Sequence, residues 1–217
     1  MDIQTRSAPS DPYKLFQFGM TRVHHVFETA FYRILKLLDD PPRQDLSNFL
    51  GYCEVWCVGL IDHHDTEEIV MFPELQKKVD FAEEIEDHKK IHDFLVKFLD
   101  QIRCALKDQD SFDPAGMIQT LKDVESRLIS HLRQEIIDLA PARLEVFSEK
   151  EIMEIMDTAE KYAISHCQMV FIPFFRSHTP PEYKFFPSLP WPFRNILLPF
   201  LAIRYRGYWK YSPYSVI

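Results

Sequence analysis

Apolar side chains recur at helical spacing along residues 14–140. A repeat of about 3.6 residues is typical of amphipathic helices that pack against one another. Asp113 followed by Pro114 is a favourable helix start, because aspartate caps the first turn and proline fits its first position. Long helices joined by short loops predict an all-α fold, an up-down-up-down four-helix bundle. The four helices are expected over about residues 14–39, 45–72, 85–106 and 113–140.

A different pattern follows Pro141. Ser148 and Glu151 have the spacing of a capping box, which predicts a fifth helix from Ser148 to about Val170. From Phe171 onward, eight prolines and fourteen aromatic residues occur within 47 residues. This proline content argues against a long helix, and this aromatic content argues against disorder. We therefore expect residues 141–217 to form a helix and an extended aromatic strap that packs on the bundle of residues 14–140.

The charge of this C-terminal segment leaves two interpretations open. Residues 171–217 contain six basic side chains and one acidic side chain, a net charge of +5, which leaves −13 for residues 1–170. A basic strap would be attracted to the acidic bundle, and this is the favoured interpretation. Contact with a membrane surface is the alternative, because basic and aromatic side chains together suit such a surface. The most apolar run, residues 196–203, is far shorter than the ~20 residues of a membrane-spanning helix.

Overall composition narrows the class of protein. The formal net charge of −8 disfavours a nucleic-acid-binding protein, which usually has a basic domain. Neither a glycine-rich phosphate loop nor a Gly-x-Ser-x-Gly motif occurs, so nucleotide and esterase chemistry have no support. The polar N-terminal residues lack the apolar run of a secretory signal, and four scattered cysteines do not make a disulfide framework. We expect a cytoplasmic protein.

Histidines and glutamates interrupt all four apolar stripes. Spacings of three and four residues place side chains on one helix face, about one turn apart. Burying so many ionisable groups would cost on the order of several kcal/mol each unless a metal compensates for the lost water. Counted from the helix ends, the four sets lie at similar heights in an antiparallel bundle, so they can converge on one site. The groups are His24, two overlapping pairs His63/Glu67 and His64/Glu68, then His88 with His92, and His131 with Glu135.

This constellation resembles the haemerythrin-like (HHE cation-binding) family, whose four-helix bundles hold two non-haem irons. The run from His64 through Glu68 to Phe72-Pro73 is similar to the family's His-x3-Glu segment, which favours the pair 64/68 over 63/67. The helical wheel independently favours His24 over His25. His25, His63 and Glu67 are then expected to orient the ligands, or to replace them if the register shifts by one. The ligands that the resemblance implies are His24, His64, Glu68, His88, His92, His131 and Glu135.

The resemblance also implies a cofactor and a function. The cofactor would be two non-haem iron ions with a bridging oxide or hydroxide, with manganese or zinc as substitutes. Five histidines, two bridging carboxylates and that bridge leave one of about twelve coordination positions open, where dioxygen or a similar small ligand would bind. We therefore expect a protein for ligand binding, sensing or iron handling. Oxygen-carrying members have an aspartate five residues after the last histidine, whereas Glu135 follows His131 by four.

The alternative is a di-iron oxidoreductase, an oxygenase or oxidase that acts on a small organic substrate. Ferritin-like oxygenases usually have two Glu-x-x-His motifs, and none occurs at a matching place in this chain. The aromatic C-terminal segment is similar to extensions of fungal-type members and could shape a substrate pocket. The candidate lining residues are Phe171, Phe174, Phe175, Trp191, Phe193 and Trp209.

Overall fold

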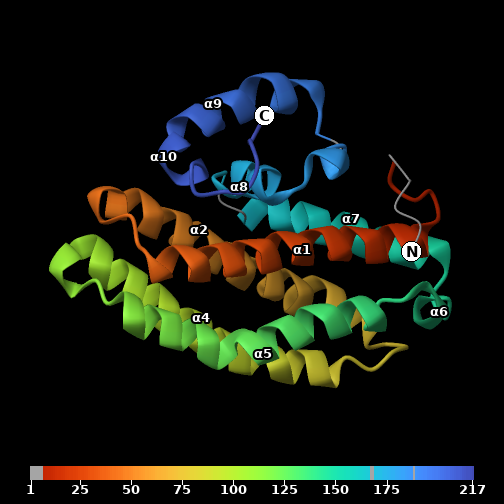
Figure 1. The fold of residues 1–217 in the computed structure, drawn as a ribbon. Coiled ribbons are helices and arrows are strands. Elements are labelled where there is room, and N and C mark those ends of the chain that lie inside the picture. The colour runs from red at the N-terminus through yellow and green to blue at the C-terminus, as the bar shows by residue number, and fades with distance from the viewer. Residues whose placement is uncertain (1–6, 167–168, 188) are drawn as a thin grey trace.

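The computed structural model describes residues 7–166, 169–187 and 189–217, and no strand occurs within these ranges. Four long helices form an antiparallel bundle, in which α1 and α2 lie on α5 and α4 (Figure 1). The predicted all-α helical bundle is confirmed. The long helices are α1 (Pro12–Asp39), α2 (Leu46–Thr66), α4 (Ala82–Lys107) and α5 (Pro114–Asp138).

Polar side chains determine where several helices begin. The Asp113 carboxylate accepts a hydrogen bond from the Gly116 amide at 3.0 Å, and Pro114 occupies the first helical position, as predicted. The predicted capping box also forms at the start of α7 (Glu149–His166). There the Ser148 amide donates to the Glu151 carboxylate at 2.7 Å, and the Glu151 amide donates to the Ser148 hydroxyl at 3.3 Å. The predicted fifth helix is therefore present, although residues 167–168 lie outside the described residues.

A wide turn interrupts the end of the second helix. Residues Glu67–Met71 form a π-helical turn, in which the Phe72 amide donates to the Glu67 carbonyl five residues back. The short helix α3 (Phe72–Leu75) follows, with Pro73 at its start. Because Pro73 has no amide hydrogen, it donates no hydrogen bond to the preceding turn. The chain thus stays helical past the predicted end at Phe72.

Two apolar clusters fill the bundle, one toward each end. The larger cluster includes Phe31, Trp56 and Phe98, and the smaller one includes Phe72 and Phe147. Along the chain, His24, His64 and His88 each lie between residues of one cluster and residues of the other, and His131 lies in the last part of α5 that belongs to the larger cluster. On α1, for example, Met20 belongs to the smaller cluster and Phe27 to the larger one, with His24 between them. The ionisable residues therefore form a buried polar layer between two apolar cores.

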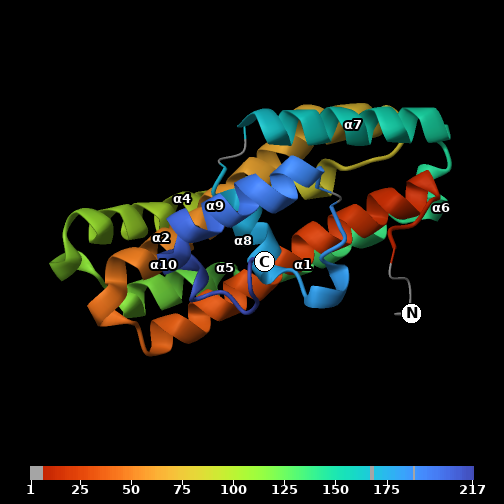
Figure 2. The same ribbon diagram turned by 90° about the horizontal axis from the view of Figure 1, so that it is seen from above.

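The C-terminal segment forms a second layer of short helices on α1 and α2 (Figure 2). We expected an extended strap because proline disrupts helix interiors. Proline is tolerated in the first turn of a helix, however, so a proline-rich segment can still form short helices. The expected packing is present, since Phe174, Trp209 and Tyr211 are buried in the larger cluster. Three α-helices follow α7: α8 (Phe171–His178), α9 (Leu198–Arg204) and α10 (Arg206–Trp209). The other short elements are α6 (Pro141–Leu144), the 3-10 turns Arg43–Asp45, Gln109–Ser111 and Pro181–Tyr183, and the π-helical turn Phe193–Leu197.

Two glycines allow this layer to approach α2 closely. A Cβ atom at Gly51 would collide with the ring of Tyr208, and one at Gly59 would collide with the ring of Phe171. Within the described residues, no helix has both the length and the apolarity needed to cross a membrane.

Candidate metal centre

Seven ionisable side chains meet in the polar layer between the two apolar clusters. They comprise five histidines and two glutamates, and all are buried except His63, which is partly exposed. Three subsets each place three ligand atoms within 4.8 Å of one another, close enough to hold a metal ion. These subsets are His64, His88 and His131; His24, His63 and Glu67; and Glu67, His88 and Glu135.

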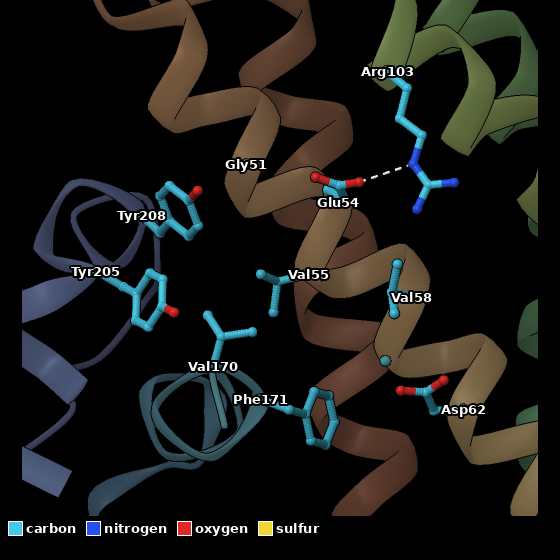
Figure 3. Close-up of a pocket in the computed structure, with 11 residues that line it drawn as sticks. Gly51, Glu54, Val55, Val58, Asp62, Arg103, Val170, Phe171, Tyr205 and Tyr208 are labelled. Atoms are coloured by element: carbon cyan, nitrogen blue, oxygen red, sulfur yellow. Dashed lines mark hydrogen bonds and ion pairs between the residues drawn. The ribbon is translucent and has the colours of Figure 1, made fainter. Parts of the chain in front are cut away.

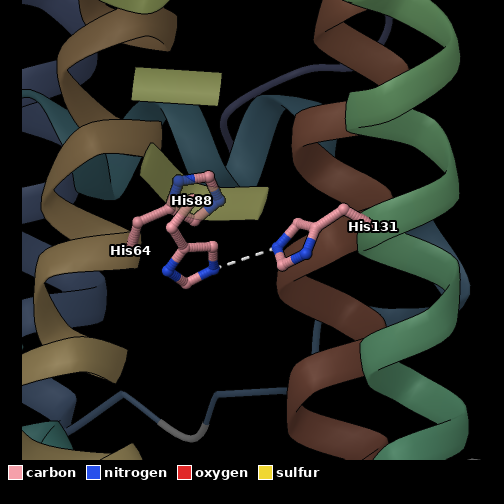
Figure 4. A group of neighbouring side chains, drawn as sticks. All are labelled: His64, His88 and His131. Atoms are coloured by element: carbon pink, nitrogen blue, oxygen red, sulfur yellow. Dashed lines mark hydrogen bonds between the residues drawn. The ribbon is translucent and has the colours of Figure 1, made fainter. Parts of the chain in front are cut away.

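The first subset is a group of three imidazoles from three helices (Figure 4). His88 Nε2 lies 3.0 Å from His131 Nε2, and the His64 ring stacks on the His88 ring at a centroid distance of 4.0 Å. His64 comes from α2, His88 from α4 and His131 from α5. The bundle thus brings together three nitrogen donors that are far apart in the sequence.

The second subset lies where α1 meets α2. His24 Nε2 is 3.0 Å from His63 Nε2, which is in turn 3.1 Å from Glu67 Oε1. His24 Nδ1 donates a hydrogen bond to the Leu132 carbonyl at 2.7 Å. Because a carbonyl can only accept, this bond places the His24 proton on Nδ1 and turns the free Nε2 toward the centre.

Each of the two buried glutamates reaches histidines of both subsets. Glu67 Oε1 faces His63, whereas Glu67 Oε2 lies 3.6 Å from His88 Nε2. Glu135 Oε2 lies 3.3 Å from His24 Nε2 and 3.9 Å from His131 Nε2. Two carboxylates between two groups of imidazoles are a suitable arrangement for a pair of metal ions.

The cluster has buried polar atoms that the protein does not satisfy. His64 Nε2 and all four carboxylate oxygens of Glu67 and Glu135 lack a hydrogen-bond partner among the described residues. A buried polar atom without a partner is costly, and a cation is the ligand that imidazole nitrogens and carboxylate oxygens share. This donor set fits iron, and it also fits manganese or zinc.

The protonation states of the cluster suit metal binding. Burial, reinforced by neighbouring histidines, lowers the pKa of His63 and His64 well below the ordinary value and that of His88 to about 3. These three imidazoles are therefore neutral and can offer lone pairs. Burial and the nearby Glu135 raise the pKa of Glu67 well above its usual range. Burial opposes ionisation of Glu135 as well, but His24 holds its pKa down to about 2.

Two residues predicted as ligands lie outside the cluster. His92 is exposed on α4, and Glu68 is exposed at the edge, where its Oε1 lies 3.0 Å from His88 Nδ1. The reason is the geometry of the α-helix, in which four residues rotate about 40° more than one full turn. Two consecutive steps of four therefore move a side chain away from the centre of the buried face. The buried line on α4 instead alternates steps of four and three, through Glu84, His88, Ile91 and Leu95.

The same alternation explains which glutamate of the second helix points inward. The buried line there runs through Leu60, His64, Glu67 and Met71, so Glu67 lies on it and Glu68 lies beside it. The structure brings together five of the predicted ligands and adds His63 with Glu67, the pair that the sequence placed around the site. His25 lies outside the cluster, near the Thr29 hydroxyl. The signal that could have identified Glu67 is the three-residue step from His64. The five predicted ligands that meet are His24, His64, His88, His131 and Glu135.

The C-terminal layer reaches the outer side of the centre through Phe171. The Phe171 ring stacks on Phe27 at 5.8 Å, and Phe27 stacks on His63 at 5.2 Å. Phe171 also borders a cavity of about 190 Å³ between α2 and the C-terminal layer, which the Glu54–Arg103 ion pair flanks (Figure 3). None of the residues that line this cavity belongs to the histidine and glutamate cluster.

Only one of the six aromatic residues predicted to line a substrate pocket borders this cavity, namely Phe171. Phe174, Phe175 and Trp209 are buried in the larger apolar cluster, whereas Trp191 is exposed to solvent. A second hollow of about 460 Å³ lies between the π-helical turn and α7. It too is lined by residues outside the cluster.

Comparison with known proteins identifies the region that carries this centre. Residues 18–142 match the family model described as the hemerythrin HHE cation binding domain. The match includes all seven residues of the cluster and leaves the C-terminal layer outside. No curated protein and no solved structure matches the chain.

Proposed function

This chain belongs to the hemerythrin HHE cation-binding family, and we propose that it is a non-haem di-iron protein that binds dioxygen or a related small ligand. The observation that carries the proposal is the position of the two buried carboxylates. Glu67 and Glu135 each reach histidines of two different groups. A single metal bound by one group of histidines would leave the other group without a ligand. Two metals, one at each group, would share the two carboxylates between them.

The proposed ligands divide unevenly between the two metals. His64, His88 and His131 would hold one iron, and His24 with His63 would hold the other. A pair of irons supplies a redox couple and room for one exogenous ligand. Because the second group has one imidazole fewer, an exogenous ligand would bind at the metal held by His24 and His63.

The surroundings of the second group suit a small, weakly polar ligand. His63 is the partly exposed member of the cluster; the Phe27 ring stacks on it, and the Phe171 ring stacks on Phe27. These aromatic rings make the surroundings of His63 apolar. The cavity near Phe171 is smaller than the roughly 300–1,000 Å³ of typical organic-ligand sites. The hollow of about 460 Å³ beside α7 is within that range, but neither space is lined by a residue of the cluster. These features support small-ligand binding over oxidation of an organic substrate.

Iron content and optical spectra of aerobically purified protein test this proposal. We expect two irons per chain and an absorption that bleaches on anaerobic reduction and returns when oxygen is admitted, over repeated cycles. Irreversible reoxidation with release of peroxide or of a modified product would favour the oxidoreductase instead. Zinc without iron, or one iron per chain, would contradict the di-iron assignment.

A further inference from the structure

A row of large apolar side chains faces outward from the C-terminal layer. Trp191, Ile196, Phe200 and Ile203 are 64%, 62%, 62% and 68% exposed. They follow one another by five, four and three residues through the π-helical turn and α9. The steps of four and three residues match one turn of a helix, so Ile196, Phe200 and Ile203 share one face, and Trp191 is exposed just before the π-helical turn. We call these residues the outer row.

The exposure of the outer row does not result from poor packing of this stretch against the rest of the protein. On the opposite side of the same stretch, Leu198 and Leu201 are only 2% and 5% exposed. Helix α9 lies on α8 and α10, which in turn lie on α1 and α2 (Figures 1 and 2). The inner face of α9 therefore attaches it to the molecule, and the outer row points away from the bundle.

Three exposed arginines accompany the outer row. Arg194, Arg204 and Arg206 lie within or next to the same stretch, and none of them forms an ion pair with the described residues. They belong to the segment of residues 171–217, whose net charge is +5. By contrast, Lys210 of the same segment pairs with Asp45. Unpaired positive charge is thus concentrated beside unpaired apolar surface.

We propose that the outer row docks the protein on an anionic membrane surface. An interfacial helix places aromatic and aliphatic side chains below the lipid headgroups and keeps arginines at the level of the phosphates. Each such arginine is attracted by the negative surface potential of an anionic leaflet. A second copy of the chain is a poorer partner for this face, because pairing two copies would bring two segments of net charge +5 together.

Vesicle co-sedimentation of the full chain tests the proposal. We expect binding to vesicles of phosphatidylcholine mixed with phosphatidylserine, and little binding to phosphatidylcholine alone. The double variant Ile196→Ser/Phe200→Ser should bind about tenfold more weakly or worse, since two side chains lose their apolar contact with lipid. The matched control is Ile137→Ser/Ile164→Ser, which changes two equally exposed isoleucines on α5 and α7 and should leave binding unchanged.

Tryptophan fluorescence provides a second readout of the same surface. Trp56 and Trp209 are buried, so a blue shift on addition of vesicles would report Trp191, and Trp191→Phe should abolish it. Replacing Arg194, Arg204 and Arg206 with glutamine should remove the preference for phosphatidylserine. The proposal is overturned if neither kind of vesicle binds, if both bind equally, or if both double variants behave like the wild type. It is also overturned if Ile196→Ser/Phe200→Ser dissolves a dimer while vesicles have no effect.

Discussion

The cost of the buried carboxylates is concentrated in the contact between Glu67 and Glu135. Both are fully buried, and their mutual repulsion adds to the burial that raises the pKa of Glu67. Two like charges in a low-dielectric interior are unfavourable unless a cation lies between them. The residues that weaken the folded protein are thus the ones that would bind metal most strongly.

His178 predicts how stability depends on pH outside the metal centre. It is buried and hydrogen-bonded to the Tyr52 hydroxyl at 2.7 Å and to the Phe174 carbonyl at 2.8 Å. Burial lowers its pKa from 6.5 to about 4. The unfolded chain therefore takes up this proton below pH 6.5, whereas the folded protein resists until about pH 4. Stability should fall as the pH decreases through this window, by up to about 3 kcal/mol.

Urea unfolding at pH 7.5 and pH 4.5 checks this expectation. The measurement compares the wild type with His178→Gln, both treated with a chelator to remove bound metal. Because the buried histidines of the centre titrate alike in the two proteins, the difference between them reports His178. The variant should show a smaller loss of unfolding free energy between the two pH values. An equal loss in both proteins would show that His178 does not titrate as we infer.

At the scale of elements, the contact between α2 and α8 depends on a missing side chain. Gly59→Ala would drive a Cβ atom into the Phe171 ring, so α8 must shift or the ring must rotate. We expect a loss of about 1–3 kcal/mol in the free energy of unfolding, the usual range for overpacking. Urea denaturation measures it.

Gly19→Ala is the matched control for this substitution. It also replaces a glycine inside a long helix, but its Cβ would make an ordinary contact with Phe186 at 3.5 Å. Because alanine favours a helix more than glycine does, this variant should be unchanged or up to about 1 kcal/mol more stable. Similar effects of the two substitutions would contradict the packing that we describe.

The long helices were predictable because their determinants are local. The capping residues Asp113 and Ser148 act within one turn, and the apolar repeat needs no knowledge of the partners. The choice between Glu67 and Glu68 was not predictable from spacing by four alone, because both fit that rule. It depends on the rotation of the whole face, which only the buried line through Leu60 and His64 reveals. The same limit applies to His92.

At the scale of the whole molecule, the C-terminal layer completes the core. Phe174, Leu198, Trp209 and Val216 belong to the same apolar cluster as the bundle residues. A chain that ends at Val170 would expose the surface that they cover, and we expect it to aggregate. Light scattering and size-exclusion chromatography measure this, with the full chain as control. A soluble, monomeric truncated chain would contradict the structural role of the layer.

The conformation of the C-terminal layer was the least predictable feature of the molecule. Its aromatic content indicated packing, and packing is observed. Which side chains face inward depends on how short, proline-started helices are placed on α1 and α2, and no repeat in the sequence records that placement. Phe200 of the outer row is exposed and Trp209 is buried, although both lie in the same aromatic and proline-rich segment.

The most direct test of the metal centre is the iron content per chain of three single variants. The structure places Glu67 between the two groups of histidines, Glu68 at the edge and His92 in solvent. We predict that Glu67→Gln loses at least one of two irons, whereas Glu68→Gln and His92→Gln retain both. Two irons in Glu67→Gln, or loss of iron in His92→Gln, would contradict the centre described here.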